Sequence, residues 1–289
     1  MDSKIRIGIV GYGNLGRGVE LAVAQNADMQ LAAVFTRRDP GGVRLQMAGV
    51  PVHGMDDIAR HCAAIDVLIL CGGSKDDLPV QGPQLARLCT TVDSFDTHAK
   101  IPEHFDAVDA AAKAGGHVAL ISIGWDPGLF SLQRLMGEAL LPQGATYTFW
   151  GKGLSQGHSD AVRRVPGVQG GVQYTIPSDE AIERVRSGER PQLNTRDKHV
   201  RECFVVLAPG ADADAVRQTI VTMPDYFADY DTTVHFISAE ELARDHGAMP
   251  HGGFVIRSGG TGVAGETHQT VAFSLKLGSN PEFTASVLV

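Results

Sequence analysis

The chain has 289 residues, of which 43% are hydrophobic and 20% charged, and its formal net charge is −8 at pH 7. This composition is typical of a soluble globular protein, and an acidic chain without a basic stripe is a poor candidate for binding nucleic acid. The sequence has no apolar run of about 18 residues and no leader pattern at its start, so it predicts neither a membrane span nor export.

The cysteines and histidines show no metal-binding or redox spacing. Cys62, Cys71, Cys89 and Cys203 form no C-x-x-C pair. Three of them lie in or beside apolar runs, where we expect cysteine to act as a small apolar side chain, and the simplest setting for the four is a reducing cytoplasm. The sequence also predicts no metal site.

The predicted elements change in character near residue 125. Residues 1–125 alternate continuous apolar runs with amphipathic segments, which predicts a Rossmann-like, doubly wound parallel sheet. From residue 126, longer strands with alternating polarity are separated by a few helical segments. Alternating polarity indicates strands with one face buried and the other exposed to solvent. That pattern favours an α+β domain with a mainly antiparallel sheet.

A dinucleotide-binding turn is predicted directly after the first apolar run. "GIVGYGNLGRG" contains G-x-G-x-x-G at Gly11, Gly13 and Gly16, between a predicted strand and a predicted helix. Such glycines allow a tight turn, close approach of a pyrophosphate and close packing of helix on strand.

The end of the second predicted strand indicates which dinucleotide binds. An NAD site usually carries Asp or Glu there, whereas this chain has Thr36, Arg37 and Arg38. Guanidinium groups pair with a 2′-phosphate, so the sequence favours NADP. Asp39 follows and leaves NAD open as an alternative.

Further candidates follow the later strands of the first half. The small residues of "CGGS", 71–74, suit close approach of a cofactor, and Asp93, Asp96 and Asp126 suit a cationic group on the substrate. Asp93 could instead form an Asx turn. For Asp126, the alternative is a helix N-cap with Pro127 in the first turn.

Two polar residues of the second half have open interpretations. Arg201 lies in an alternating strand, where it faces either solvent or the carboxylate of a ligand. His251, in "MPHGG", is either a structural loop residue or part of a site.

Six blocks together resemble one enzyme family along essentially the whole chain. They are "VGYGNLGR", "TVDSFD", "GWDPG", "FWGKGLSQGHSDAVRRVPGVQ", "TMPDYF" and "MPHGG". The chain is similar to meso-diaminopimelate D-dehydrogenases. The resemblance implies an NADP-binding domain (1–125), a substrate-binding and dimerisation domain (126–278), and a C-terminal segment starting at 279–289 that returns to the first domain.

The resemblance also implies an activity and a set of site residues. The expected reaction is the reversible, NADP-dependent oxidative deamination of the D-centre of meso-2,6-diaminopimelate to L-2-amino-6-oxopimelate and ammonia, a step of lysine biosynthesis, by a cytoplasmic homodimer. The product cyclises to tetrahydrodipicolinate. Asp96 and Asp126 are expected to be catalytic. The expected substrate contacts are Asp96, Trp125, Asp126, Trp150, Gln156, Gly157, Thr175, Arg201, His251 and Asn280. The expected cofactor contacts are Gly11, Tyr12, Gly13, Asn14, Leu15, Thr36, Arg37, Arg38, Cys71, Gly72, Gly73, Ser74, Asp93, Ser94, Phe95, Ile123, Gly124, Trp125, Asp126 and Pro127.

Other classes fit the sequence less well. Sugar dehydrogenases of similar architecture carry a lysine in an E-K-P motif at the fifth strand, where this chain reads "SFDTHAK". A semialdehyde dehydrogenase needs an exposed nucleophilic cysteine, and Cys71 and Cys89 lie in or beside apolar runs. An NADP-sensing regulator without catalysis has no need of paired carboxylates.

Overall fold

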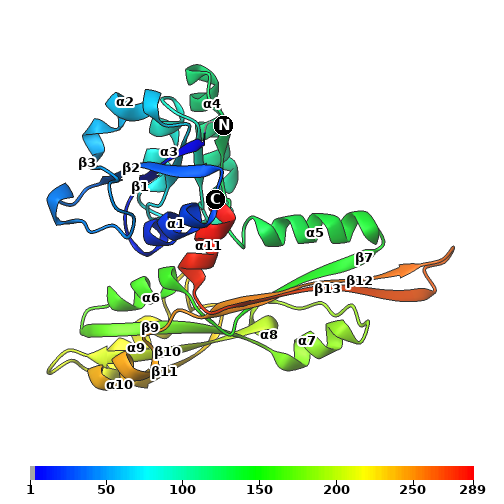
Figure 1. Cartoon of the computed structure of the whole chain (residues 1–289). Coiled ribbons are helices and arrows are strands. Elements are labelled where there is room, and N and C mark those ends of the chain that lie inside the picture. Colours follow the sequence, from blue (N-terminus) through cyan, green and yellow to red (C-terminus); the bar gives the residue numbers. More distant parts are fainter. Residues whose placement is uncertain (1–3) are drawn as a thin grey trace. The chain divides into compact units, whose positions relative to one another are not determined.

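The computed structural model describes residues 4–289 and divides them into two compact units. The first unit comprises residues 4–131 together with Pro281–Val289, and the second comprises Leu132–Asn280 (Figure 1). None of the helices in residues 4–289 is both long enough and apolar enough to span a lipid bilayer.

The first unit is built on a six-stranded sheet in the order β3-β2-β1-β4-β5-β6, in which every neighbouring pair is parallel. The strands are β1 (Ile5–Val10), β2 (Met29–Thr36), β3 (Val52–Gly54), β4 (Val67–Leu70), β5 (Thr91–Asp93) and β6 (Ala119–Leu120). The order reverses between β1 and β4, as in a doubly wound fold.

Helices cover both faces of this sheet, which is why its strands are continuously apolar. The helices are α1 (Asn14–Gln25), α2 (Ile58–His61), α3 (Leu78–Ala86), α4 (Ile101–Gly115) and α11 (Asn280–Leu288). In β4, Ile69 packs in a core with side chains of α1 and α11, while Leu68 and Leu70 pack in a second core with side chains of α2 and α3. The last helix lies directly on α1, since a Cβ on Gly18 would come within 2.8 Å of the Ala285 side chain.

The second unit contains two sheets. One has the order β11-β10-β9-β8, and the other β13-β12-β7. The strands are β7 (Gly144–Trp150), β8 (Gly153–Leu154), β9 (Val168–Pro177), β10 (His199–Leu207), β11 (Asp231–Phe236), β12 (His251–Thr261) and β13 (Thr267–Leu277). All pairs are antiparallel except β10 with β11. The predicted fold class is therefore confirmed, with one parallel pair added.

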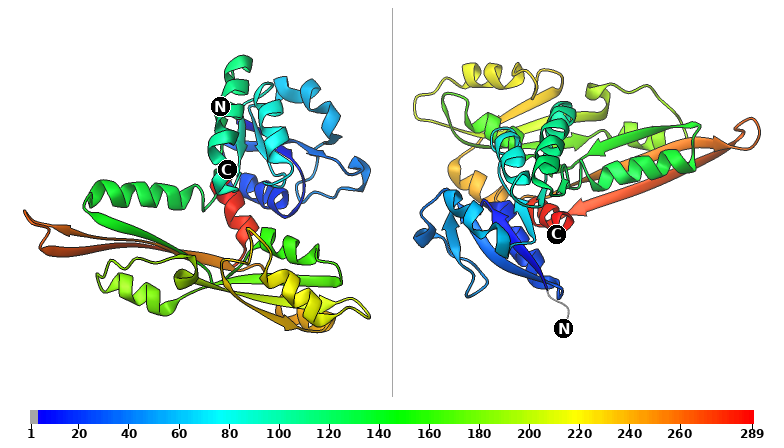
Figure 2. Two further views of the ribbon diagram at one scale, coloured as in Figure 1. Left: turned by 180° about the vertical axis from the view of Figure 1, so that it is seen from behind. Right: turned by 90° about the horizontal axis from the view of Figure 1, so that it is seen from above.

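The helices of the second unit cover separate faces of these sheets. They are α5 (Leu129–Leu140), which begins in the first unit, α6 (Gln156–Arg163), α7 (Asp179–Arg186), α8 (Thr195–Lys198), α9 (Ala213–Val221) and α10 (Ala239–Asp245). Ile182 of α7 packs on Phe149 and Ile256 of the three-stranded sheet, while Ile220 of α9 packs on β10 and β11. The β12–β13 hairpin extends beyond α5 in every view (Figures 1 and 2).

The structure corrects the prediction for two cysteines. Cys62 and Cys89 form a disulfide that joins the segment before β4 to the segment that follows α3, at a sequence separation of 27. Both also lie in the apolar core on that face of the sheet. Sequence could not show this pairing, because it depends on how the two segments pack.

Candidate active site

The glycine-rich turn joins β1 to α1. Gly11 has a φ of +93°, and a Cβ on Gly16 would lie 2.2 Å from the Gly11 carbonyl oxygen. A Cβ on Gly13, the N-cap residue of α1, would meet nothing within 4 Å. The turn itself therefore requires the first and third glycines, whereas the second leaves open backbone at a helix N-terminus. That arrangement fits a dinucleotide pyrophosphate.

A buried carboxylate holds this turn in place. Glu20 of α1 is fully buried, and it accepts hydrogen bonds from the Tyr12 hydroxyl and, at 2.6 Å, from the Met47 backbone N–H. Burial and the bond to Glu20 raise the pKa of Tyr12 to about 12. The phenol therefore stays protonated and donates, so that it ties the turn to α1.

The end of β2 presents two exposed arginines. The Arg38 guanidinium donates to the Tyr12 carbonyl oxygen, and its backbone N–H donates to the Thr36 hydroxyl at 3.1 Å. Asp39, the residue that left NAD open, caps a short 3-10 helix by accepting from the Gly41 N–H at 3.2 Å. Cationic groups and a buried hydroxyl stand where an NAD site carries its acid, which suits a 2′-phosphate.

Asp77, which sequence reasoning missed, links Arg37 to the loop after β4. Its two oxygens accept from the Arg37 guanidinium at 2.7 and 3.1 Å, and one of them also accepts from the Gly73 N–H at 2.8 Å. A fork of this kind holds a guanidinium plane in one orientation. The available signal was an acid three residues after "CGGS".

Cys71 is not suited to covalent catalysis. Its thiol donates to the Ile69 carbonyl oxygen at 3.7 Å, and burial raises its pKa. A thiol that stays protonated is a poor nucleophile, which counts against a semialdehyde dehydrogenase.

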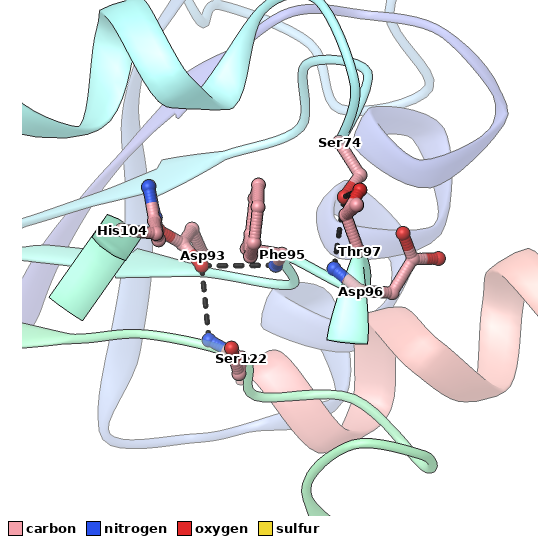
Figure 3. A network of polar contacts seen from close by, with 7 residues as sticks. All are labelled: Ser74, Asp93, Phe95, Asp96, Thr97, His104 and Ser122. Atoms are coloured by element: carbon pink, nitrogen blue, oxygen red, sulfur yellow. Dashed lines mark hydrogen bonds and ion pairs between the residues drawn. The ribbon is translucent and has the colours of Figure 1, made fainter. Parts of the chain in front are cut away.

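Asp93 is buried and bound to the protein through both oxygens (Figure 3). One oxygen accepts from the Phe95 and Ser122 N–H groups at 2.9 and 3.0 Å, and the other lies 2.8 Å from Nε2 of His104. The bond to Phe95 is the Asx turn that sequence left open. A cofactor contact for Asp93 stays a prediction.

The two predicted catalytic carboxylates lie on neighbouring turns of the first unit. Asp96 is exposed, and its backbone N–H donates to the Ser74 hydroxyl at 2.9 Å (Figure 3). Asp126 is half-buried in the turn from Gly124 to Gly128. A Cβ on Gly124 would lie 4.0 Å from the Ser94 side chain, so the turn that carries Asp126 and the turn that carries Asp96 lie next to each other.

The predicted helix cap at Asp126 is wrong. The Gly124 N–H donates to the Pro127 carbonyl oxygen at 3.0 Å, the Asp126–Pro127 peptide bond is cis, and α5 begins only at Leu129. Asp126 and Pro127 therefore belong to a closed turn. Trp125 is buried there, edge-on to the ring of Phe130.

The second unit holds its own polar cluster, centred on Arg201 of β10. Arg201 is 5% exposed, so the solvent-facing alternative is wrong. Its guanidinium donates to the hydroxyl of Thr175 on β9 and lies 3.9 Å from the ring centre of Tyr230. Within residues 4–289 no carboxylate forms an ion pair with Arg201, and its Nε has no hydrogen-bond partner. A buried cation of this kind suits a ligand carboxylate.

Three histidines near Arg201 are held neutral. Burial, with the charge of Arg201 as a further cause, lowers the pKa of His158 and His199 to about 3 and that of His251 to about 4. These side chains therefore act near neutral pH as uncharged donors and acceptors. They do not add positive charge.

The remaining predicted substrate residues lie at the ends of helices and strands of the same unit. The backbone N–H of Trp150 donates to His199 Nε2 at 2.8 Å, and its ring stacks on the His199 ring. The Gln156 side-chain amide donates to the Met249 sulfur at 3.2 Å, and the Met249 backbone carbonyl oxygen accepts from the Asn280 N–H at 2.9 Å. The "GLSQGH" and "MPHGG" blocks, far apart in sequence, thus meet. Gly157 is exposed at the start of α6.

A family model and several known proteins match this chain. The family model of the diaminopimelic acid dehydrogenase C-terminal domain matches residues 124–279. A meso-diaminopimelate D-dehydrogenase of Ureibacillus thermosphaericus is 65% identical over 99% of this chain and 87% of its own length.

The chain belongs to the meso-diaminopimelate D-dehydrogenase family.

Two solved structures of this kind agree with the fold. The C. glutamicum DAP dehydrogenase in complex with DAP superimposes with a TM-score of 0.91 at 48% identity, covering 98% of this chain and 86% of that one. An engineered D-amino acid dehydrogenase bound to NADP+ gives 0.88 at 45% identity, covering 99% and 87%. The predicted family and enzyme class are therefore confirmed.

Several polar residues in this family member were absent from the predicted site. Gln173, which is fully buried on β9, donates to the Thr175 hydroxyl at 3.4 Å, while its Oε1 has no hydrogen-bond partner in the described part of the chain. His199 and Tyr230 contact Trp150 and Arg201 as described above. The available signal was polar residues at alternate positions of an apolar strand, as in "VQYTIP".

Proposed function

We propose that the protein catalyses the reversible oxidative deamination of the D-centre of meso-2,6-diaminopimelate with NADP, yielding L-2-amino-6-oxopimelate and ammonia. The observation that carries this proposal is the pair of carboxylates, Asp96 and Asp126, on two neighbouring turns of the domain that bears the dinucleotide fingerprint. An enzyme of lysine biosynthesis that uses NADP is expected to work in the cytoplasm.

The cofactor is held by the first unit. Bound NADP+ supplies the two-electron acceptor of the reaction. The open backbone at Gly13 faces the pyrophosphate, and Arg37 and Arg38 bind the 2′-phosphate, Arg37 with its plane set by Asp77. The small residues 71–74 allow close approach after β4.

The carboxylates handle the nitrogen of the D-centre. Asp96 and Asp126 bind the ammonium group, and one of them accepts its proton directly or through water. Loss of that proton frees the nitrogen lone pair, which must push as the Cα–H bond breaks. Water then replaces the nitrogen, which leaves as ammonia.

Arg201 and its neighbours recognise the distal L-centre. The guanidinium binds the L-carboxylate, and Thr175 shares this site. Neutral His251 and Asn280 bind the remaining polar groups of that centre. A free amino acid that lacks this second centre would lose these contacts, so the distal site selects diaminopimelate over simpler D-amino acids.

A turnover assay with separate stereoisomers tests the proposal. The protein is incubated with NADP+ and the meso, L,L or D,D isomer, and the absorbance of the reduced cofactor is followed. We expect turnover with the meso isomer alone. Tight NADP binding without turnover of any isomer would indicate a sensing protein, and turnover of sugars in place of diaminopimelate would indicate a sugar dehydrogenase.

The assembly we propose is a homodimer formed through the second unit. One face of α5 packs on β12, where Gly137 lies against the Arg257 side chain. The opposite face exposes Leu132, Leu135, Met136 and Leu140 to 58–65%. Four large apolar side chains at helical spacing exceed the scattered apolar exposure of a monomer surface, and a second copy of this chain would cover them.

A further inference from the structure

We propose that Asp93, held by His104, is a positioning residue that sets the two turns carrying Asp96 and Asp126. The inference rests on the proposed function, in which those carboxylates handle the D-centre nitrogen. Asp93 and His104 are only 2% and 5% exposed. They act through the backbone of the two turns and do not touch the substrate.

One carboxylate oxygen and the backbone of Asp93 hold both turns (Figure 3). Oδ1 accepts from the N–H of Phe95, the residue before Asp96, and from the N–H of Ser122, where the segment to Asp126 begins. The Asp93 carbonyl oxygen also accepts from the Ile123 N–H at 2.8 Å. Ser122 has a φ of 58°, which a residue with a side chain adopts only when its surroundings compensate the strain.

His104 keeps that carboxylate from rotating. Its Nε2 lies 2.8 Å from Oδ2 of Asp93, and its ring stacks on Phe95 with centres 4.2 Å apart. A Cβ on Gly82 of α3 would come within 2.8 Å of the ring, so α3 closes the other side. The carboxylate is therefore fixed by a ring that has little room to move.

The two turns depend on each other. Ser94 faces Gly124 across the gap between them, and the Ser74 hydroxyl holds the Asp96 N–H. A change in one turn therefore moves the other. Displacing a catalytic group by about 1 Å can cost on the order of 100-fold in rate.

Four variants separate positioning from simple support of the fold. Asp93→Ala removes the shared acceptor, whereas Asp93→Asn keeps a carbonyl oxygen for the two N–H groups. His104→Phe keeps the ring stack but removes the polar contact, whereas His104→Gln keeps a polar atom near Asp93. Val108→Ala is the matched control, because Val108 is buried on the same helix, α4, and is in the core with Ala111 and Ala112.

Three measurements are made on each folded variant. They are kcat with meso-diaminopimelate, hydrogen exchange of peptides covering 94–97 and 121–127, and the emission of Trp125. The chain has two tryptophans, so emission is read in a Trp150→Phe background, in which Trp125 remains the single reporter. Exchange and emission do not depend on turnover.

We expect Asp93→Ala to lower kcat at least about 10-fold, to speed exchange in both peptides and to shift Trp125 emission. Asp93→Asn should stay within about threefold of the wild type in kcat. The inference is wrong if Asp93→Ala leaves exchange and emission unchanged, or if Val108→Ala loses as much kcat at equal stability.

If Asp93→Ala does not fold, the two His104 variants, His104→Phe and His104→Gln, test the inference. His104→Phe must then speed exchange in both peptides and lower kcat, while His104→Gln must not; equal behaviour of the two variants overturns the inference. Absence of turnover in the wild-type protein would overturn the proposed function instead, and exchange and emission would still test the positioning role.

Discussion

Asp126 illustrates how the setting of one residue changes what it does. As a helix cap, it would stabilise α5 by about 1 kcal/mol, and its removal would lower stability. In the closed turn before α5 it has no such role. A substitution there is therefore expected to act on turnover.

We predict that Asp126→Asn lowers kcat by about 100-fold or more, because the amide has neither the negative charge that pairs with the ammonium group nor the capacity to accept a proton. The Kd for NADP+, measured by calorimetry, should change less than about threefold, since the amide preserves the shape of the turn. Asp109→Asn, on the exposed face of α4, is the control. Equal losses of turnover and cofactor affinity would contradict the assigned role.

At the end of β2 we predict that Arg37→Ser with Arg38→Ser removes the preference for NADP over NAD. Each charge-assisted contact with the 2′-phosphate is worth about 1.5–3 kcal/mol, so the ratio of kcat/KM values should fall at least about 10-fold. Arg44→Ser is the matched control, because this nearby exposed arginine bonds only to backbone carbonyl groups of its own loop. An unchanged ratio in the double variant would exclude the 2′-phosphate role.

At the scale of elements, β10 carries a buried cation, Arg201, in the second unit. It places Arg201 between Thr175 of β9 and Thr232 of β11, in a sheet whose register fixes both neighbours. Burial of the surrounding histidines, and next the charge of Arg201, make their protonation costly. Because these histidines resist protonation in the folded protein, the free energy of unfolding should depend on pH.

We predict that stability falls as the pH is lowered from 6.5 toward 4. Histidine in an unfolded chain titrates near 6.5, whereas His158, His199 and His251 do so only at about 3 to 4 when folded. The unfolded chain therefore binds more protons in this window, and each histidine contributes a slope of about 1.4 kcal/mol per pH unit. Above pH 6.5 this contribution is constant.

Urea unfolding between pH 4.5 and 7.5 measures that slope. His199→Gln should reduce it by about 1.4 kcal/mol per pH unit, while the exposed His268→Gln should leave it unchanged. If the stability of the wild type did not vary with pH in this range, these histidines would not be held in their neutral form in the folded protein.

At the scale of the whole molecule, the chain builds two units with separate cores, and its last helix belongs to the first of them. Two copies of the chain pair through a surface patch of the folded protein. We propose that this patch is the exposed apolar face of α5. The assembly can therefore be disrupted without touching either set of site residues.

We predict that Leu135→Lys with Met136→Lys converts the dimer to a monomer in sedimentation velocity, because two desolvated charges would oppose the contact. Leu21→Lys on α1 is the control, since Leu21 is another exposed apolar residue, 42% exposed, outside that face. A sedimentation coefficient that does not change would place the dimer contact elsewhere, and a monomeric wild type would exclude the dimer.

Much of the fold and part of the site could be predicted from local pattern. Continuous and alternating apolar runs report whether a strand is buried on two faces or one, and the glycine fingerprint reports a turn made within a few residues. The arginines after β2 likewise follow from position alone. These features are local, so one sequence contains them.

Contacts between distant segments were decided by the tertiary structure. The disulfide, the hold of Asp77 on Arg37 and the contact of Asp93 with His104 each join side chains whose separation depends on packing. The same holds for Asp126, whose turn is closed by backbone groups. By itself the sequence determined which chemical groups are available and on which elements. Only the tertiary structure decided which of them meet, because the partner of a buried polar group is selected by the packing around it.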